Sequence, residues 1–197
     1  MRQFVILLCV SIVLYYSSQT DRVGYIPNLH FSSDQKWNDR MVEWHTEFLT
    51  ALKEPSLYAL SNNTYAHSYR FLWLRSFDNP IALRLSLNND GSAILNVKVT
   101  NGEGGYGPGQ LITSKTLHLT QAQVDEFLNL LEHANFWCLP TMDERKGLDG
   151  ATWILEGIKG GKYQIVVKWS PEEGDFRKAA LFLLELSELN IDSDRIY

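Results

Sequence analysis

A glutamate stands where a hydrophobic residue is expected in the last hairpin of this sequence. Residues 153–159 and 162–169 flank Gly160-Gly161, a two-residue connection that suits the positive φ angles of a type I′ turn. With that turn Glu156 faces Ile165, so its carboxylate falls on the apolar face of the hairpin. A carboxylate removed from water needs a cationic partner, or it stays protonated. Buried acids in clefts are candidates for catalysis.

Glu156 therefore has two interpretations. In the structural one it forms an ion pair with a strand arginine, for which Arg70, Arg75 and Arg84 are the candidates. In the catalytic one it works with Asp149 as the two carboxylates that a glycosidase places across a cleft. Asp149 precedes a glycine and is more typical of a turn. The structural interpretation is favoured, and Glu156 and Asp149 remain weak catalytic candidates.

A glycine-rich segment at residues 102–107 matches the pattern G-x-G-x-x-G. A dinucleotide site needs this pattern between a strand and a helix, so that the helix N-terminus meets the pyrophosphate. Here Pro108-Gly109 and an expected strand follow, which predicts a flexible or tightly bent connection between strands. Gly104, Gly105 and Tyr106 are kept as weak binding candidates because the tyrosine could be exposed at the centre of the loop. Trp153, on the polar face of the last hairpin, is a fourth.

The sequence contains no motif for a metal site or for an esterase nucleophile. The histidines are isolated and no His-Glu-x-x-His or paired Cys/His pattern occurs, so we expect neither a metal site nor a cofactor. No Gly-x-Ser-x-Gly pattern is present for an esterase nucleophile. Cys138 lies in Phe-Trp-Cys-Leu, residues 136–139, which predicts a small buried hydrophobic residue.

Charge and the N-terminus bear on partners and compartment. The 197 residues carry a formal net charge of −5 with both signs interspersed, which argues against binding to nucleic acid or to anionic lipid. Residues 1–20 contain one arginine, an apolar stretch from Phe4 to Tyr16 and small polar residues. This layout predicts a signal peptide, with an uncleaved N-terminal anchor as the alternative. The protein is then periplasmic or extracellular, and it touches the membrane only through that segment.

The elements that position these residues follow from hydrophobic periodicity. Apolar residues at helical spacing predict a helix over 36–52, and Thr120 with Gln123 predicts a capping box that starts a second helix reaching residue 133. A third helix runs to residue 189 and is expected to be the most buried. Period-two alternation and aromatic enrichment predict strands at these positions: 69–77, 81–87, 93–99, 111–119, 153–159 and 162–169.

Short turns between these strands imply antiparallel pairing. We expect an α+β protein with a mainly antiparallel sheet of about six strands and three helices, at least two of them packed on one face, with the helices together covering that face. Residues 21–68 form an N-terminal helix and connector. They are expected to belong to one domain with the α+β unit at 69–197.

One segment carries a resemblance to other proteins. Gly-Leu-Asp-Gly-Ala-Thr-Trp-Ile-Leu-Glu-Gly at 147–157, followed by Lys-Trp-Ser-Pro-Glu at 168–172, resembles a set of uncharacterised bacterial exported proteins. The resemblance covers about residues 69–189. It implies a bacterial origin and the extent of the domain, and it implies no activity and no catalytic residue.

These observations favour a non-enzymatic exported domain that binds an unknown protein or envelope ligand. The alternative is a hydrolase of envelope polymers that uses Glu156 or Asp149. A third interpretation, an inhibitor or immunity-type partner, requires a flat apolar surface patch.

Overall fold

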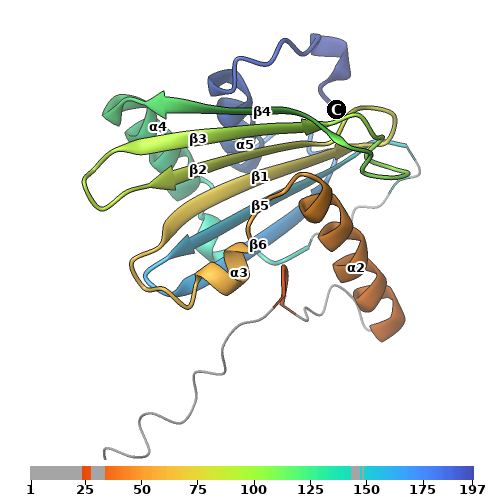
Figure 1. Ribbon diagram of the computed structural model, residues 1–197, viewed down its shortest axis with the longest axis horizontal. Helices are drawn as coiled ribbons and strands as arrows, with labels where there is room; N and C mark the ends of the chain where they lie inside the picture. The colour runs from red at the N-terminus through yellow and green to blue at the C-terminus, as the bar shows by residue number, and fades with distance from the viewer. Residues whose placement is uncertain (1–23, 28–33, 143–146, 148) are drawn as a thin grey trace, which may run out of the picture.

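A six-stranded antiparallel sheet forms the centre of the protein, with the strand order β4-β3-β2-β1-β5-β6 (Figure 1). The computed structural model describes residues 24–27, 34–142, 147 and 149–197, so the expected signal peptide or anchor at 1–20 lies outside the described residues. The strands are β1 His67–Arg75, β2 Ile81–Leu87, β3 Ala93–Thr100, β4 Leu111–Leu119, β5 Ala151–Lys159 and β6 Lys162–Trp169.

Local turns make four of the five strand pairings, and one pairing brings distant parts of the chain together. β1 to β4 follow one another as neighbours, and β5 and β6 form the final hairpin. Gly160 and Gly161 have φ angles of 59° and 77°, and Glu156 lies opposite Ile165, which confirms the expected turn and register. β1 also pairs along its whole length with β5, so β1 becomes a central strand.

The helices begin where the sequence provides capping groups. Asp34 accepts hydrogen bonds from two backbone N–H groups at the start of the first helix, and Thr120 and Gln123 form the predicted capping box. The final helix is the most buried of the three long ones in proportion to its length, as expected. The helices are α2 Gln35–Ala51, α3 Leu57–Leu60, α4 Gln121–His133 and α5 Asp175–Leu186, with 3₁₀ turns η1 Phe136–Cys138 and η2 Ser193–Arg195.

Hydrophobic cores lie on both faces of the sheet. Tyr69, Phe71 and Trp73 of β1 pack on the side of α4 and α5, whereas Leu72 and Leu74 pack on the side of α2. The expectation that two helices pack on one face is confirmed, but the expectation that all helices share that face is wrong (Figure 1). β1 is buried at eight of its nine positions, as expected of a strand that is covered on both faces.

The structure corrects two expectations about burial: Trp153 was expected to be exposed and Cys138 to be buried. Trp153 is fully buried in the core beneath α4 and α5, and its indole donates a hydrogen bond to the Tyr197 carbonyl oxygen. The face of the hairpin that looked polar is in fact the face that α5 covers. Cys138 is exposed, because the η1 turn directs Phe136 into the core and leaves the cysteine outside.

Candidate functional site

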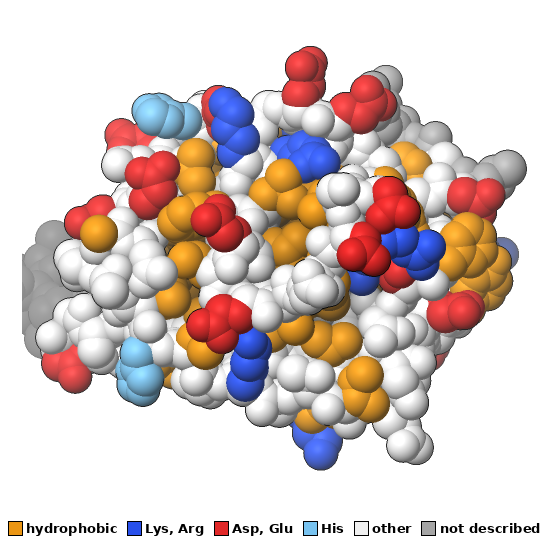
Figure 2. All heavy atoms as spheres, turned by 90° about the horizontal axis from the view of Figure 1, so that it is seen from above, with side chains coloured by type: hydrophobic (Ala, Val, Ile, Leu, Met, Phe, Trp, Pro, Cys, Tyr) orange, Lys and Arg blue, Asp and Glu red, His pale blue; other side chains and the backbone are white. Residues whose placement is uncertain are grey.

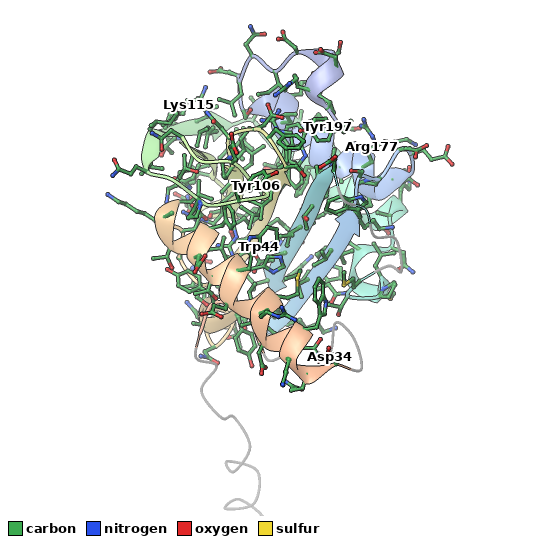
Figure 3. All side chains as sticks on the ribbon, turned by 90° about the vertical axis from the view of Figure 1, so that its right-hand side faces the viewer. Asp34, Trp44, Tyr106, Lys115, Arg177 and Tyr197 are labelled. Atoms are coloured by element: carbon green, nitrogen blue, oxygen red, sulfur yellow. The ribbon has the colours of Figure 1, made fainter. Side chains whose placement is uncertain are left out.

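A pocket of about 600 Å³ lies between α2 and the ends of β5 and β6. Trp37, Met41 and Trp44 line it from α2, Met142 lines it from the segment before β5, and Trp169 lines it from the end of β6. We call this site the tryptophan pocket. In Figure 3, Trp44 lies midway along α2 with β5 and β6 beside the helix, and Asp34 marks the N-terminal end of that helix.

The pocket arises because the apolar stripe of α2 is longer than the part of the sheet that it covers. Phe48 and Leu49, in the last turns of α2, are buried against the sheet. Trp37, Met41 and Trp44 continue the same stripe toward the N-terminus but are only partly buried. The Trp44 ring packs edge-on against Phe48 with 5.2 Å between the ring centroids. The stripe therefore anchors the helix at one end and lines the pocket at the other.

The third indole packs closely against two glycines. A Cβ atom on Gly147 would lie 2.3 Å from Nε1 of Trp169, and one on Gly150 would lie 2.7 Å from the same ring. Both distances are far below van der Waals contact, so the indole fits only because these residues have no side chain. Met142 is fixed in a parallel bridge beside Val167. The wall formed by Trp169 and Met142 is therefore preformed.

Two acidic and two basic residues are among those that line the pocket. Glu43 and Glu47 are exposed on α2, one turn apart. Arg40 also lines the pocket, but its Nε donates a 3.4 Å hydrogen bond to the Lys36 carbonyl oxygen, toward the N-terminal end of the helix. The Lys168 ammonium lies 5.3 Å from the centroid of the Phe176 ring, which belongs to α5 on the opposite face of the sheet.

His45 adds no positive charge to this helix. Its side chain is fully buried next to Trp44, and burial together with the nearby Arg70 guanidinium lowers its pKa to about 3. The imidazole is therefore neutral at physiological pH.

Glu156 lies in a buried ion pair. Arg70 donates to Oε2 of Glu156 through both Nε, at 2.8 Å, and Nη2, and neither side chain is exposed to solvent. Tyr163 donates its hydroxyl to the other carboxylate oxygen at 2.9 Å. Burial and the adjacent Glu156 raise the pKa of Tyr163 well above its ordinary value. Burial opposes the charge on Arg70, yet Glu156 and Glu54 hold the pKa of that guanidinium above its ordinary value.

Glu54 extends this pair into a network that the sequence did not reveal. It is buried immediately after α2, with Arg84 donating to its Oε2 at 2.8 Å and the Lys98 ammonium 2.9 Å from its Oε1. Arg70 reaches it at 3.5 Å. Three cations from β1, β2 and β3 thus enclose two carboxylates. No spacing in the sequence relates Glu54 to these strands, because the contact depends on how α2 crosses the sheet.

The two weak catalytic candidates do not form a site. Asp149 is exposed in the bend before β5, whereas Glu156 has no solvent-accessible side chain and is engaged by Arg70 and Tyr163. A glycosidase acid must reach the substrate, and Glu156 reaches only protein atoms.

The glycine-rich loop connects β3 and β4 and packs closely against the end of β1. Gly104 is buried and donates to the Asp78 carbonyl oxygen, and Gly105 donates to that of Ser76. Tyr106 is 72% exposed, and its ring lies 6.0 Å from that of Phe77, which is 50% exposed. The glycines are structural, and only the tyrosine of the three candidates presents its side chain to solvent.

The face seen from above Figure 1 bears on the inhibitor interpretation. Figure 2 shows strips of hydrophobic side chains on it that are interrupted by charged ones. Leucines such as Leu117, Leu119 and Leu128 are partly buried against the core on this side of the sheet. This face does not present one flat apolar patch.

Comparison with known proteins gives no assignment: no protein-family model matches this chain, and no curated protein matches it in sequence. Among the described residues, no group of His, Cys, Asp and Glu side chains could hold a metal ion. Within the same part of the chain, no helix is long and apolar enough to cross a membrane. The geometry of the tryptophan pocket therefore carries the functional argument.

Proposed function

We propose that this protein is a non-enzymatic exported domain of the bacterial cell envelope, and that it binds its ligand in the tryptophan pocket. The observation that carries the proposal is a 600 Å³ pocket lined by three indoles and two methionines. Ligand sites in proteins are concave, mostly apolar and about 300–1,000 Å³ in volume, with a few polar groups that orient the ligand.

The pocket is largely preformed. Trp169 packs against the two glycines beside it, and Trp44 packs against Phe48. A preformed site loses little side-chain freedom on binding, so more of the contact energy remains as affinity. Exposing several partly buried tryptophans at one place has no benefit for folding, which favours a role in recognition.

The hydrolase alternative has no observation in its favour. Glu156 is committed to Arg70 in the core, and Glu43 and Glu47, the carboxylates of the pocket, are exposed on the surface of one helix. No nucleophile paired with a base lines the pocket among the described residues.

A neutral fluorescent probe, N-phenyl-1-naphthylamine, tests the binding site. We expect saturable binding to the purified protein, weakened at least tenfold by Trp44→Ala and by Trp37→Ala, because each removes one aromatic wall. Tyr106→Ala is the matched control, since it removes an exposed aromatic side chain that does not line the pocket. Equal affinity in all four proteins would place the probe elsewhere and contradict the proposal.

Export is tested separately. N-terminal sequencing of the protein from fractionated cells should find it in the periplasm or medium and beginning near residue 21, or anchored with the leader retained. A chain that stays in the cytoplasm would refute this part of the proposal and leave the pocket untouched.

A further inference from the structure

We infer that the tryptophan pocket takes an organic cation that carries apolar substituents, such as a quaternary ammonium amphiphile. This inference rests on the proposed function and specifies the chemistry of the ligand. It combines the aromatic lining of the pocket with the sign of the charges around it.

The aromatic lining suits a cation that needs no hydrogen bonds. Trp37 and Trp44 belong to α2 and Trp169 faces them from β6, so indoles stand on two sides of the same space. The face of an indole carries partial negative charge and attracts a cation within about 6 Å of the ring centroid, more strongly than a tyrosine or phenylalanine ring does. Met41 and Met142 add adaptable apolar surface for alkyl substituents.

The charges favour the same sign of ligand. Glu43 and Glu47 place two carboxylates on the lining, one turn apart on α2. The cations compensate them in part: Arg40 places one positive charge on the lining, whereas the Lys168 ammonium lies against Phe176 on the other face of the sheet. His45 stays neutral because its pKa is about 3. Complementary potential of this kind selects ligands by the sign of their charge.

Neutral polar side chains are scarce on the lining of the pocket. Among the described residues that line the pocket, only Thr152 provides a neutral hydroxyl group, and no asparagine, glutamine or tyrosine is present. The other polar groups on the lining are indole N–H groups and charged side chains. A quaternary ammonium group has no hydrogen-bond donor to satisfy, so the indole faces and the nearby carboxylates can compensate the loss of its hydration.

Three amphiphiles with the same decyl chain test the inference by displacement of N-phenyl-1-naphthylamine, below their micelle concentrations. The cation is decyltrimethylammonium, the anion decanoate, and the neutral compound decyl maltoside. We expect the cation to bind at least tenfold more tightly than the anion and several-fold more tightly than the neutral compound. The double variant Glu43→Gln/Glu47→Gln should weaken cation binding at least fivefold and leave the neutral compound unchanged.

Glu103→Gln is the matched control, because it removes one exposed carboxylate in the glycine-rich loop, which does not line the pocket. The outcomes separate the two proposals. Binding of all three amphiphiles with equal affinity, tighter binding of decanoate, or a double variant that holds the cation as tightly as the native protein would overturn the cation inference while the apolar pocket stands. Failure of the probe and of every amphiphile to bind would overturn the proposed function itself.

Discussion

At the scale of single residues, two fully buried carboxylates show how this protein handles charge in its interior. Glu156 and Glu54 have no exposed side-chain surface, and both are contacted by Arg70. Removing one member of a buried ion pair leaves an uncompensated charge in the core, whereas replacing both with hydrophobic residues is often neutral. The network therefore constrains how β1, β5 and the end of α2 fit together.

Glu156→Gln should destabilise the protein by about 3–5 kcal/mol, because Arg70 would lose its closest counter-charge in a dry environment. Urea unfolding measures the change. Glu188→Gln, which breaks the exposed pair with Lys115, is the matched control and should cost about 0–1 kcal/mol. If the single variant does not fold, the double variant Arg70→Met/Glu156→Leu should restore folding. Equal stability of the Glu156 and Glu188 variants would show that the buried pair is unimportant.

His45 should make stability depend on pH. Its pKa is about 3 in the folded protein against an ordinary value of 6.5. Between pH 6.5 and 3, the imidazole therefore becomes protonated in the unfolded chain but stays neutral in the folded protein. The contribution of neutral His45 to the free energy of unfolding is complete above pH 6.5 and is lost as the pH falls toward 3. From pH 7.5 to 5.0 the loss should be about 2 kcal/mol.

His45→Gln provides the comparison, because it cannot be protonated in this range. Urea unfolding at both pH values should show a drop in the native protein that is about 2 kcal/mol larger than in the variant. The carboxylates titrate alike in both proteins and cancel. Parallel pH profiles would mean that His45 is accessible to protons in the folded state.

At the scale of elements, the glycine-rich loop shows how one sequence pattern can serve packing alone. A Cβ atom on Gly104 would lie 2.5 Å from the Arg75 carbonyl oxygen, whereas one on Gly107 would meet nothing within 4 Å. The loop closes against the end of β1 and needs its buried glycine for that close approach. The match to G-x-G-x-x-G has no connection with phosphate here, since the next element is β4 and not a helix.

Gly104→Ala should therefore cost roughly 1–3 kcal/mol, because the added methyl group has to displace backbone atoms. Gly107→Ala is the matched control in the same loop and should change the unfolding free energy by less than about 0.5 kcal/mol. Thermal unfolding followed by circular dichroism measures both. A Gly104 variant as stable as the native protein would show that the loop can move away from β1.

At the scale of the whole molecule, the sheet is shared by two cores. Leu72, Ile154 and Val167 pack beneath α2, and alternate residues of the same strands pack beneath α4 and α5. β1 and β5 contribute side chains to both cores. Unfolding of these strands would therefore disrupt both cores together. For this reason we expect the N-terminal helix to belong to one domain with the sheet.

The native chain should accordingly unfold in one cooperative transition, with coincident changes in secondary structure and in tryptophan fluorescence. A variant that lacks residues 1–53 should aggregate or lose the cooperative transition, since its sheet would expose the apolar face that α2 covers. Calorimetry and sedimentation check both statements. A truncated chain that unfolds cooperatively as a monomer would show that residues 54–197 fold independently.

The sequence by itself determined the local structure of this protein. Hydrophobic period, capping residues and turn glycines act over a few residues, so the three long helices, the six strands and the register opposite Glu156 could be predicted. So could the need of Glu156 for a cationic partner, with Arg70 among the three candidates.

Only the tertiary structure decided which partner Glu156 takes, that α2 lies on the face opposite α4 and α5, and that Trp153 is buried. Each of these depends on the pairing of β1 with β5, which joins segments about 80 residues apart and has no local signature. The tryptophan pocket was missed for the same reason. The stripe of Trp37, Met41 and Trp44 was visible as one face of a helix, but the sequence does not say where the sheet beneath that face ends.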